Sequence, residues 1–214
     1  MRVNVSAAAG EPSATGGQTA ANTARRAQII EAAIECIAEN GYARASFAQI
    51  ARRAGISSTR LISYHFEGKE DLIRAVVQEA LRAAGAYMRP LLQAQTSSSA
   101  MLATYITSNM AFIRTHPAHI RALLEIAANT RPDSAVPAVE PDSASPVALL
   151  EQLFRQGQDA GEFRPFDPRV MALSLRAAID AAVSELTARP DLDLDAYARE
   201  LVALFDRATR KEPK

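Results

Sequence analysis

Apolar side chains recur every three to four residues along most of the chain, and this spacing limits the possible folds more than any other feature. The first clear case places five apolar residues on one helical face: Ile29, Ile30, Ala33, Ile34 and Ile37. Gly41, in the sequence ENGY, is suited to the end of that helix. No segment of useful length alternates apolar and polar residues as a strand would. The sequence therefore predicts an all-α protein with about nine helices.

Residue types that begin and end helices divide the chain further. The first helix is expected from Thr23, and Ser46 caps a second, short helix that ends at Gly55. A third short helix is expected over 58–65, with Ser57 as its N-cap. A long helix follows over about 70–92, and prolines, serines or aspartates open five more, over 98–114, 117–129, 146–159, 168–188 and 193–210.

Two segments lack the apolar side chains that a packed element needs. Residues 1–22 are mostly Ala, Gly, Ser and Thr, so we expect a disordered tail, because the segment cannot bury enough surface to offset its ordering entropy. Residues 130–145 are rich in proline and small polar residues, which predicts a loop.

Charge is balanced over the whole chain but not along it. The 24 Lys and Arg equal the 24 Asp and Glu, which argues against a protein coated with basic residues. Between Arg44 and Lys69, however, five basic residues face one acidic residue. A phosphate-facing surface shows this asymmetry, and so does a solvated basic face.

Cysteine content and hydropathy favour a cytoplasmic protein. The single cysteine, Cys36, cannot form an intramolecular disulfide. No run approaches the roughly 18 apolar residues that a membrane span needs, and the N-terminus does not resemble a secretion signal.

The stretch AGISSTRLISYHF has the pattern of a helix-turn-helix, two short helices joined by a turn that contains glycine. In this motif the second helix enters the DNA major groove, which accepts short or polar side chains. Ser58, Thr59, Arg60 and Ser63 meet that requirement. The Arg60 guanidinium can donate two hydrogen bonds to guanine, a contact that discriminates between bases by about 1–3 kcal/mol. The hydroxyls can instead cap the helix and face water.

A wider set of residues resembles the DNA-binding region of the TetR family of transcriptional regulators. The matching segments are Gly41-Tyr42, Ser46, the stretch IARRAGIS over 50–57, Tyr64-His65-Phe66 and KEDL over 69–72. The resemblance covers about residues 25–74. The stretch from Ile56 to Phe66 is one residue longer than is usual in the family. The extra residue either lengthens the turn or rotates the recognition face by about 100°.

The resemblance implies a helix-turn-helix domain over 23–69 and a helical bundle over 70–210 that binds an effector and dimerises through its last two helices. It assigns DNA-backbone contacts to Ser46, Tyr64, His65 and Lys69. Tyr42 and Phe66 are expected in the core, because aromatic residues at these spacings pack the three short helices together. Together with the major-groove chemistry and the basic segment, it predicts ten DNA-binding residues: Arg44, Ser46, Ser57, Ser58, Thr59, Arg60, Ser63, Tyr64, His65 and Lys69.

Polar and aromatic residues on the inward faces of the C-terminal helices are candidates for an effector pocket, because bundle interiors are normally apolar. The candidates are Tyr105, Asn109, Phe112, Arg121, Glu125, Asn129, Phe154, Met171, Arg176 and Asp180. Arg176 and Asp180, four residues apart, equally suit a pair on a helix surface. His116 and His119 stand three apart, as two metal ligands can, but exposed histidines at a helix start explain them, and we expect neither a metal nor a cofactor.

We therefore expect a homodimeric DNA-binding transcriptional regulator, a repressor that a small-molecule effector releases from a palindromic operator. One alternative is a metal-dependent hydrolase, but the chain has only three histidines and neither a Gly-x-Ser-x-Gly nor a His-Glu-x-x-His motif. The other is a helical small-molecule-binding or interaction module with weak or lost DNA binding, which the extra residue before Phe66 keeps open.

Overall fold

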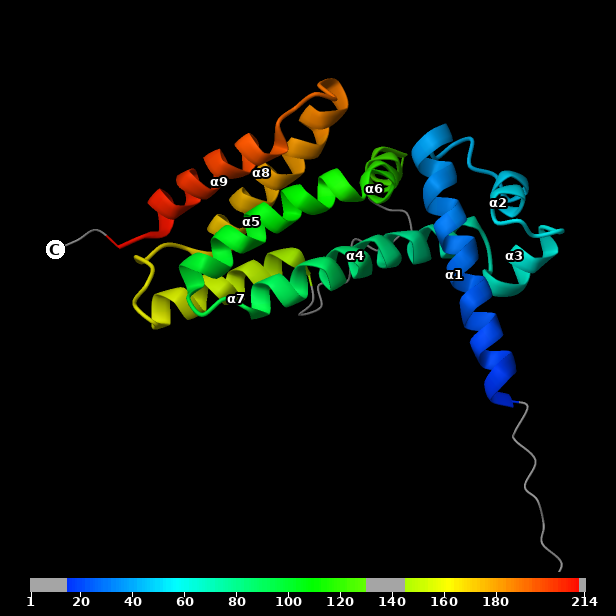
Figure 1. The fold of residues 1–214 in the computed structure, drawn as a ribbon, viewed down its shortest axis with the longest axis horizontal. Helices are drawn as coiled ribbons and strands as arrows, with labels where there is room; N and C mark the ends of the chain where they lie inside the picture. Colours follow the sequence, from blue (N-terminus) through cyan, green and yellow to red (C-terminus); the bar gives the residue numbers. More distant parts are fainter. Residues whose placement is uncertain (1–14, 130–144, 212–214) are drawn as a thin grey trace, which may run out of the picture.

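The computed structural model describes residues 15–129 and 145–211, which contain nine helices and no strand (Figure 1). This confirms the predicted all-α class. The helices are α1 Thr15–Asn40, α2 Phe47–Arg53, α3 Arg60–His65, α4 Lys69–Gln93, α5 Ser98–Thr115, α6 Pro117–Asn129, α7 Pro146–Asp159, α8 Pro168–Ala188 and α9 Leu194–Thr209.

Helix α1 begins at Thr15, within the segment 1–22 expected to be a disordered tail. The physical reason is alanine, which has the highest helix propensity and is frequent just ahead of the packed part of α1. Residues 1–14 lie outside the described part of the chain, as do residues 130–144 of the predicted loop.

Helix α3 begins at Arg60 and not at Ser58 as the sequence suggested. The Ser58 hydroxyl accepts a hydrogen bond from the Arg60 amide at 3.2 Å, and the Ser58 carbonyl accepts one from the Leu61 amide at 3.2 Å. These two bonds form a turn that leads into the helix. Ser57 therefore does not cap α3, because Ser58 takes the local hydrogen-bonding role.

The N-terminal core unites α1, α2, α3, the first half of α4 and part of α6. Ile34, Ile62 and Leu72 are almost completely buried in it, and Ala122 and Ile126 of α6 belong to the same cluster. The packing unit around the helix-turn-helix thus extends past residue 69. Helix α6 is a structural component of both halves of the molecule.

The C-terminal core lies between α5, α7, α8 and α9, with α4 running alongside α5 and connecting it to the N-terminal core (Figure 1). Ile106, Leu175 and Phe205 are among its buried residues. Gly157 is required here by a close approach, because a Cβ at this position would lie 2.2 Å from the Phe163 ring.

The sequence also led to expectations about Cys36 and about membrane-spanning helices. Cys36 is buried, and its burial raises the pKa of the thiol, as suits a packed side chain. None of the helices in the described ranges has the length and apolar character needed to cross a membrane.

Candidate DNA interface and effector cavity

Helix α2 is fixed at its start by a reciprocal pair of hydrogen bonds. The Ser46 hydroxyl accepts from the Gln49 amide at 3.3 Å, and the Gln49 side-chain oxygen accepts from the Ser46 amide at 3.3 Å. This capping box satisfies two helix N-terminal donors. After α2, Gly55 takes a positive φ of 63°, which glycine adopts without strain, and turns the chain toward α3.

Helix α3 has one buried face and one exposed face. Ile62 is 0% exposed and Phe66, which follows the helix, is 2% exposed. On the opposite face Arg60, Ser63 and Tyr64 are exposed, and Tyr64 is 71% exposed. The buried Ile62 and Phe66 thus orient this short helix so that its arginine, hydroxyl and phenol side chains point outward.

Two basic residues lie beside α3, and the side chain of each donates a hydrogen bond to a backbone carbonyl. The Lys69 ammonium donates to the Tyr42 carbonyl at 3.1 Å and lies 4.4 Å from the centroid of the Tyr42 ring. The Arg44 guanidinium donates to the Asn40 carbonyl at 2.7 Å, at the end of α1. Both side chains remain exposed, so each keeps donors for an anion.

Arg53 differs from the other basic residues of this segment, because it is neutralised by two carboxylates of α1. It pairs with Glu35 at 2.9 Å and with Glu39. The other four, Arg44, Arg52, Arg60 and Lys69, have no carboxylate partner in the ranges that the structure describes. The basic surface is thus smaller than the sequence count indicates.

The remaining predicted DNA-binding residues lie in or next to α3. Ser57, Ser58 and Thr59 are exposed in the turn before the helix. His65 is half-buried, packs edge-to-face against Tyr64 at 5.1 Å between ring centroids, and has a buried Nε2 with no hydrogen-bond partner among the described residues. Its position favours support of Tyr64 over direct contact with DNA.

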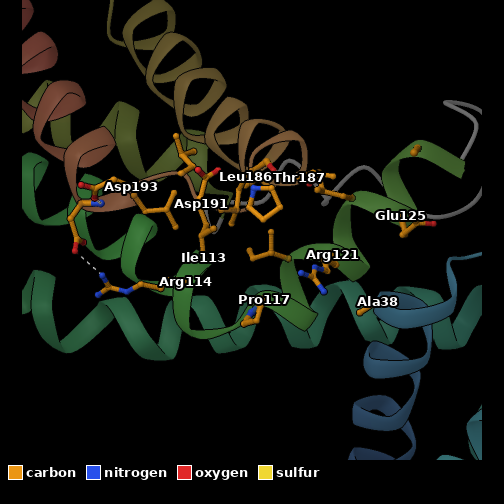
Figure 2. A pocket seen from close by; sticks show the side chains of 18 residues that line it. Ala38, Ile113, Arg114, Pro117, Arg121, Glu125, Leu186, Thr187, Asp191 and Asp193 are labelled. Atoms are coloured by element: carbon orange, nitrogen blue, oxygen red, sulfur yellow. Dashed lines mark hydrogen bonds and ion pairs between the residues drawn. The ribbon is translucent and has the colours of Figure 1, made fainter.

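A cavity of about 780 Å³ lies between α5, α6, the end of α8 and the connection to α9 (Figure 2). Its wall is apolar where Ile113, Ile120 and Leu124 meet Val183 and Leu186. Six charged residues also line it, namely Arg114, Arg121, Glu125, Asp191, Asp193 and Asp195. Four carboxylates therefore face two guanidiniums.

Of the predicted pocket residues, the structure places Arg121 and Glu125 in this cavity. Four others, Tyr105, Asn109, Arg176 and Asp180, form a separate polar cluster between α5 and α8. Arg176 donates to the Asn109 side-chain oxygen at 3.3 Å, to the Tyr105 hydroxyl at 3.5 Å and to the Asp180 carboxylate at 3.0 Å.

The last four predicted pocket residues are dispersed. Phe112 stacks on His116 at 4.2 Å between ring centroids, and Phe154 packs against Phe163 and Phe166. Met171 packs against the C-terminal core, and Asn129 is exposed at the end of α6.

The two helix-start histidines are not exposed as expected. Both are half-buried, because they pack with Phe112 at the junction of α5 and α6. His119 Nε2 lies 3.9 Å from a carboxylate oxygen of Glu31 on α1.

The aspartates between the end of α8 and the first turn of α9 were not among the predicted pocket residues. Asp193 caps α9 by accepting from the amides of Ala196 at 2.9 Å and Asp195 at 3.0 Å, and these backbone hydrogen bonds lower the pKa of its carboxyl group. Asp195 pairs with Arg114 at 2.8 Å. Helical periodicity, which suggested the other candidates, carries no information about a connection between helices.

A hydrogen bond joins the cavity to the helix-turn-helix half. Glu125, which lines the cavity, accepts from the Tyr42 amide at 3.1 Å. Because the Tyr42 carbonyl accepts from Lys69, two hydrogen bonds connect the cavity lining to a predicted DNA contact.

The helix-turn-helix segment matches a known protein family. The family described as bacterial regulatory proteins, tetR family, matches residues 29–76. The HTH-type transcriptional regulator BetI of Cronobacter sakazakii (strain ATCC BAA-894) is 36% identical over 110 residues, which cover 50% of this chain and 53% of that protein. The chain thus spans about half the length of this curated relative.

Solved structures show the same fold over most of the chain. A protein solved to explain control of antibiotic production by a bacterial hormone is 28% identical, with a TM-score of 0.74 over 87% of this chain and 97% of that one. AibR in complex with isovaleryl coenzyme A and operator DNA is 22% identical, with a TM-score of 0.70 over 84% of this chain and 97% of that one. Residues 29–76 therefore belong to the tetR family of bacterial regulatory proteins, and most of the chain has the fold of these solved structures.

Proposed function

We propose that this chain is a homodimeric repressor that binds a palindromic operator through α3 and releases it when a small molecule enters the cavity. The observation that carries the proposal is the outward face of α3, where Arg60, Ser63 and Tyr64 are exposed while Ile62 and Phe66 anchor the helix. The family consists of regulators and not of enzymes, which removes the reason to consider a hydrolase. Such a repressor acts in the cytoplasm, where the operator lies.

The dimensions and charge of this face suit a DNA major groove. The groove is about 12 Å wide and admits one α-helix. Ser57, Ser58 and Thr59 precede α3, so we infer that the turn accommodates the extra residue and leaves the α3 face continuous. Lys69 and Arg44, tethered beside the helix, would supply sequence-independent contacts with phosphates.

A dimer would present two such helices. Val170 and Leu173 on α8 are 60% and 47% exposed, and Leu204 on α9 is 58% exposed. Exposed apolar residues grouped on neighbouring elements mark interaction surfaces. Pairing of these faces in two copies would let two α3 helices read half-sites about 34–36 Å apart, as a palindrome requires.

The cavity between α5, α6 and the α8–α9 connection is the proposed effector site. AibR was solved in complex with isovaleryl coenzyme A, a molecule that carries several negative charges. Here four carboxylates face two guanidiniums, and one guanidinium, that of Arg114, is already paired with Asp195. We therefore expect this chain to prefer a neutral or cationic apolar molecule, because an anion would be repelled by the lining.

The coupling between effector and DNA would run through Glu125 as well as through α4. An effector that draws the Glu125 carboxylate into the cavity would break its hydrogen bond with the Tyr42 amide, and Tyr42 holds Lys69. By linkage, operator DNA and effector would then weaken each other's binding by the same factor.

Selection of bound sequences from random duplex DNA, followed by footprinting, tests the proposal. We expect a palindrome whose half-sites are about one helical turn apart. Recovery of no preferred sequence by a chain that binds small molecules would favour an interaction module without DNA recognition.

A further inference from the structure

We propose that the N-terminal turns of α1 form a basic arm that gives this protein a second DNA contact. In this arm, residues 15–28, Arg25 and Arg26 bind phosphates of the duplex beside the segment read by α3. This role depends on the DNA binding proposed for α3 and extends it to residues outside α2 and α3.

The arm extends beyond the packed part of the DNA-binding domain. Helix α1 has 26 residues, but its first buried side chain is that of Ile29, and every residue from 19 to 28 is exposed. Figure 1 shows this end of α1 continuing past α3 with no other helix against it. A helical segment that contacts the rest of the domain only through its last turn is marginally stable in water, so it gains most from a partner that lies along it.

The charge of the arm identifies the kind of partner. Between residues 15 and 30 the chain has two arginines and no acidic residue. Arg25 and Arg26 have no carboxylate partner within the described ranges, whereas Arg53 of the same domain has two. Guanidinium groups left without a counter-charge, next to a surface that faces DNA, match the phosphate backbone in charge and in bidentate hydrogen-bonding geometry.

Both arginines are held at the helix-turn-helix. Arg25 donates to the Gln28 side-chain oxygen at 2.7 Å, and Gln28 donates to the Ala54 carbonyl at 2.6 Å, where the turn after α2 begins. The Arg26 guanidinium carbon lies 4.9 Å from the centroid of the ring of Phe66, the residue that follows α3. The two cations are therefore oriented at the two ends of the turn and recognition helix, which reduces the entropy lost when they bind phosphates.

The test is the salt dependence of DNA binding by the full chain. The probe is a fluorescently labelled duplex recovered by selection from random DNA, and the readout is the slope of log K against log salt concentration. Each phosphate contact contributes about −0.9 to this slope. Arg25→Ala combined with Arg26→Ala should make the slope less negative by about 1.8 per protomer, and Arg25→Ala alone by about 0.9.

Two further variants separate phosphate contact from other causes. Replacing both arginines with lysine should retain most of the slope, because the charge remains. Arg89→Ala combined with Arg199→Ala removes the same charge from exposed sites on α4 and α9 and should leave the slope unchanged. Arg25→Ala leaves the contact between Arg26 and the Phe66 ring in place, so this variant remains informative if the double substitution unfolds the domain.

The outcomes distinguish the arm from the proposed function. If the wild-type chain binds the duplex and both arginine-to-alanine variants keep its slope and affinity, the arm makes no DNA contact. An equal change of the salt slope in the Arg89 and Arg199 control would also overturn the inference, since general electrostatic attraction would then explain the change. If the wild-type chain binds no duplex, DNA binding through α3 fails first, and the arm with it.

Discussion

Glu125 on α6 accepts a hydrogen bond from the backbone amide of Tyr42 at 3.1 Å, although 83 residues separate the two in the chain. Gly41, beside Tyr42, leaves room for this carboxylate, because a Cβ there would lie 3.1 Å from the same Glu125 oxygen. Glu125 also lines the cavity, and Tyr42 binds Lys69 through its carbonyl. The contact thus connects the proposed effector site with the proposed DNA surface.

Replacing Glu125 with alanine should therefore affect both stability and regulation. The partly buried Tyr42 amide would lose its acceptor, which lowers the free energy of unfolding by about 1 kcal/mol. Operator affinity without effector should fall, because Tyr42 no longer holds Lys69 firmly, and effector should then cause little further release. Urea unfolding and operator titrations with and without effector measure these changes.

Two controls accompany this prediction. Glu125→Gln keeps a side-chain oxygen as acceptor and should restore most of the stability. Ala127→Ser alters an exposed residue of the same helix that does not line the cavity and should leave regulation intact. Normal regulation in Glu125→Ala would show that the signal takes another route, such as a shift of α4.

Lys69→Ala should weaken binding to all DNA sequences by a similar factor. The ammonium group is a point charge beside the recognition helix, and a phosphate contact carries no sequence information. The salt slope should become less negative by about 0.9 per protomer. A variant that binds one sequence normally and another poorly would instead assign Lys69 a role in reading bases.

Arg60→Ala should blur sequence preference and have a smaller effect on nonspecific binding. Arg60 is exposed in the first turn of α3, the position from which a side chain reaches base edges. Loss of a bidentate contact to guanine costs about 1–3 kcal/mol of discrimination. Repeating the random-DNA selection with the variant shows whether one guanine in each half-site loses its constraint. An unchanged selected sequence would mean that Arg60 does not face the bases.

Leu173→Glu combined with Leu204→Glu should convert a dimer into monomers and abolish operator binding. These side chains are 47% and 58% exposed on α8 and α9, and a charge placed on each would remain unpaired within the paired faces. Light scattering coupled to size-exclusion chromatography gives the mass in solution. Leu91→Glu, at a 43% exposed position on α4, is the matched control and should remain dimeric.

The charge of the cavity predicts which small molecules stabilise the protein. Tetraphenylphosphonium, an apolar cation, should raise the melting temperature more than isovaleryl coenzyme A does, because carboxylates outnumber guanidiniums in the lining. Replacing both Asp191 and Glu125 with their amides should reduce that difference. Stronger stabilisation by isovaleryl coenzyme A would contradict the preference expected here.

Helical periodicity was sufficient to predict most of this fold. The helices over 146–159 and 168–188 have the expected bounds, since a proline marks the start of each and the apolar spacing continues to its end. Local hydrogen bonds caused the differences at α3, where the Ser58 side chain delays the helix start. The outward position of Ser63 and Tyr64 could also be predicted, because Ile62 and Phe66 define the opposite face.

The parts of the site that depend on tertiary contacts could not be predicted. Arg53 counts as a basic residue in the sequence, but only the packing of α1 against α2 brings Glu35 and Glu39 to it. Similarly, the cavity owes its charge to Asp191 and the other aspartates after α8, which no periodic pattern connects with α6. Sequence spacing describes one element at a time, whereas these features arise where two elements meet.

Equilibrium binding of the full chain to duplex DNA, measured as salt concentration rises, tests most directly whether the exposed face of α3 is a DNA-reading surface. We expect tight binding at low salt that falls steeply as salt increases, with a selected palindrome bound far more tightly than a scrambled duplex. Absence of binding to any duplex at low salt, or equal affinity for the palindrome and its scrambled form, would contradict this account.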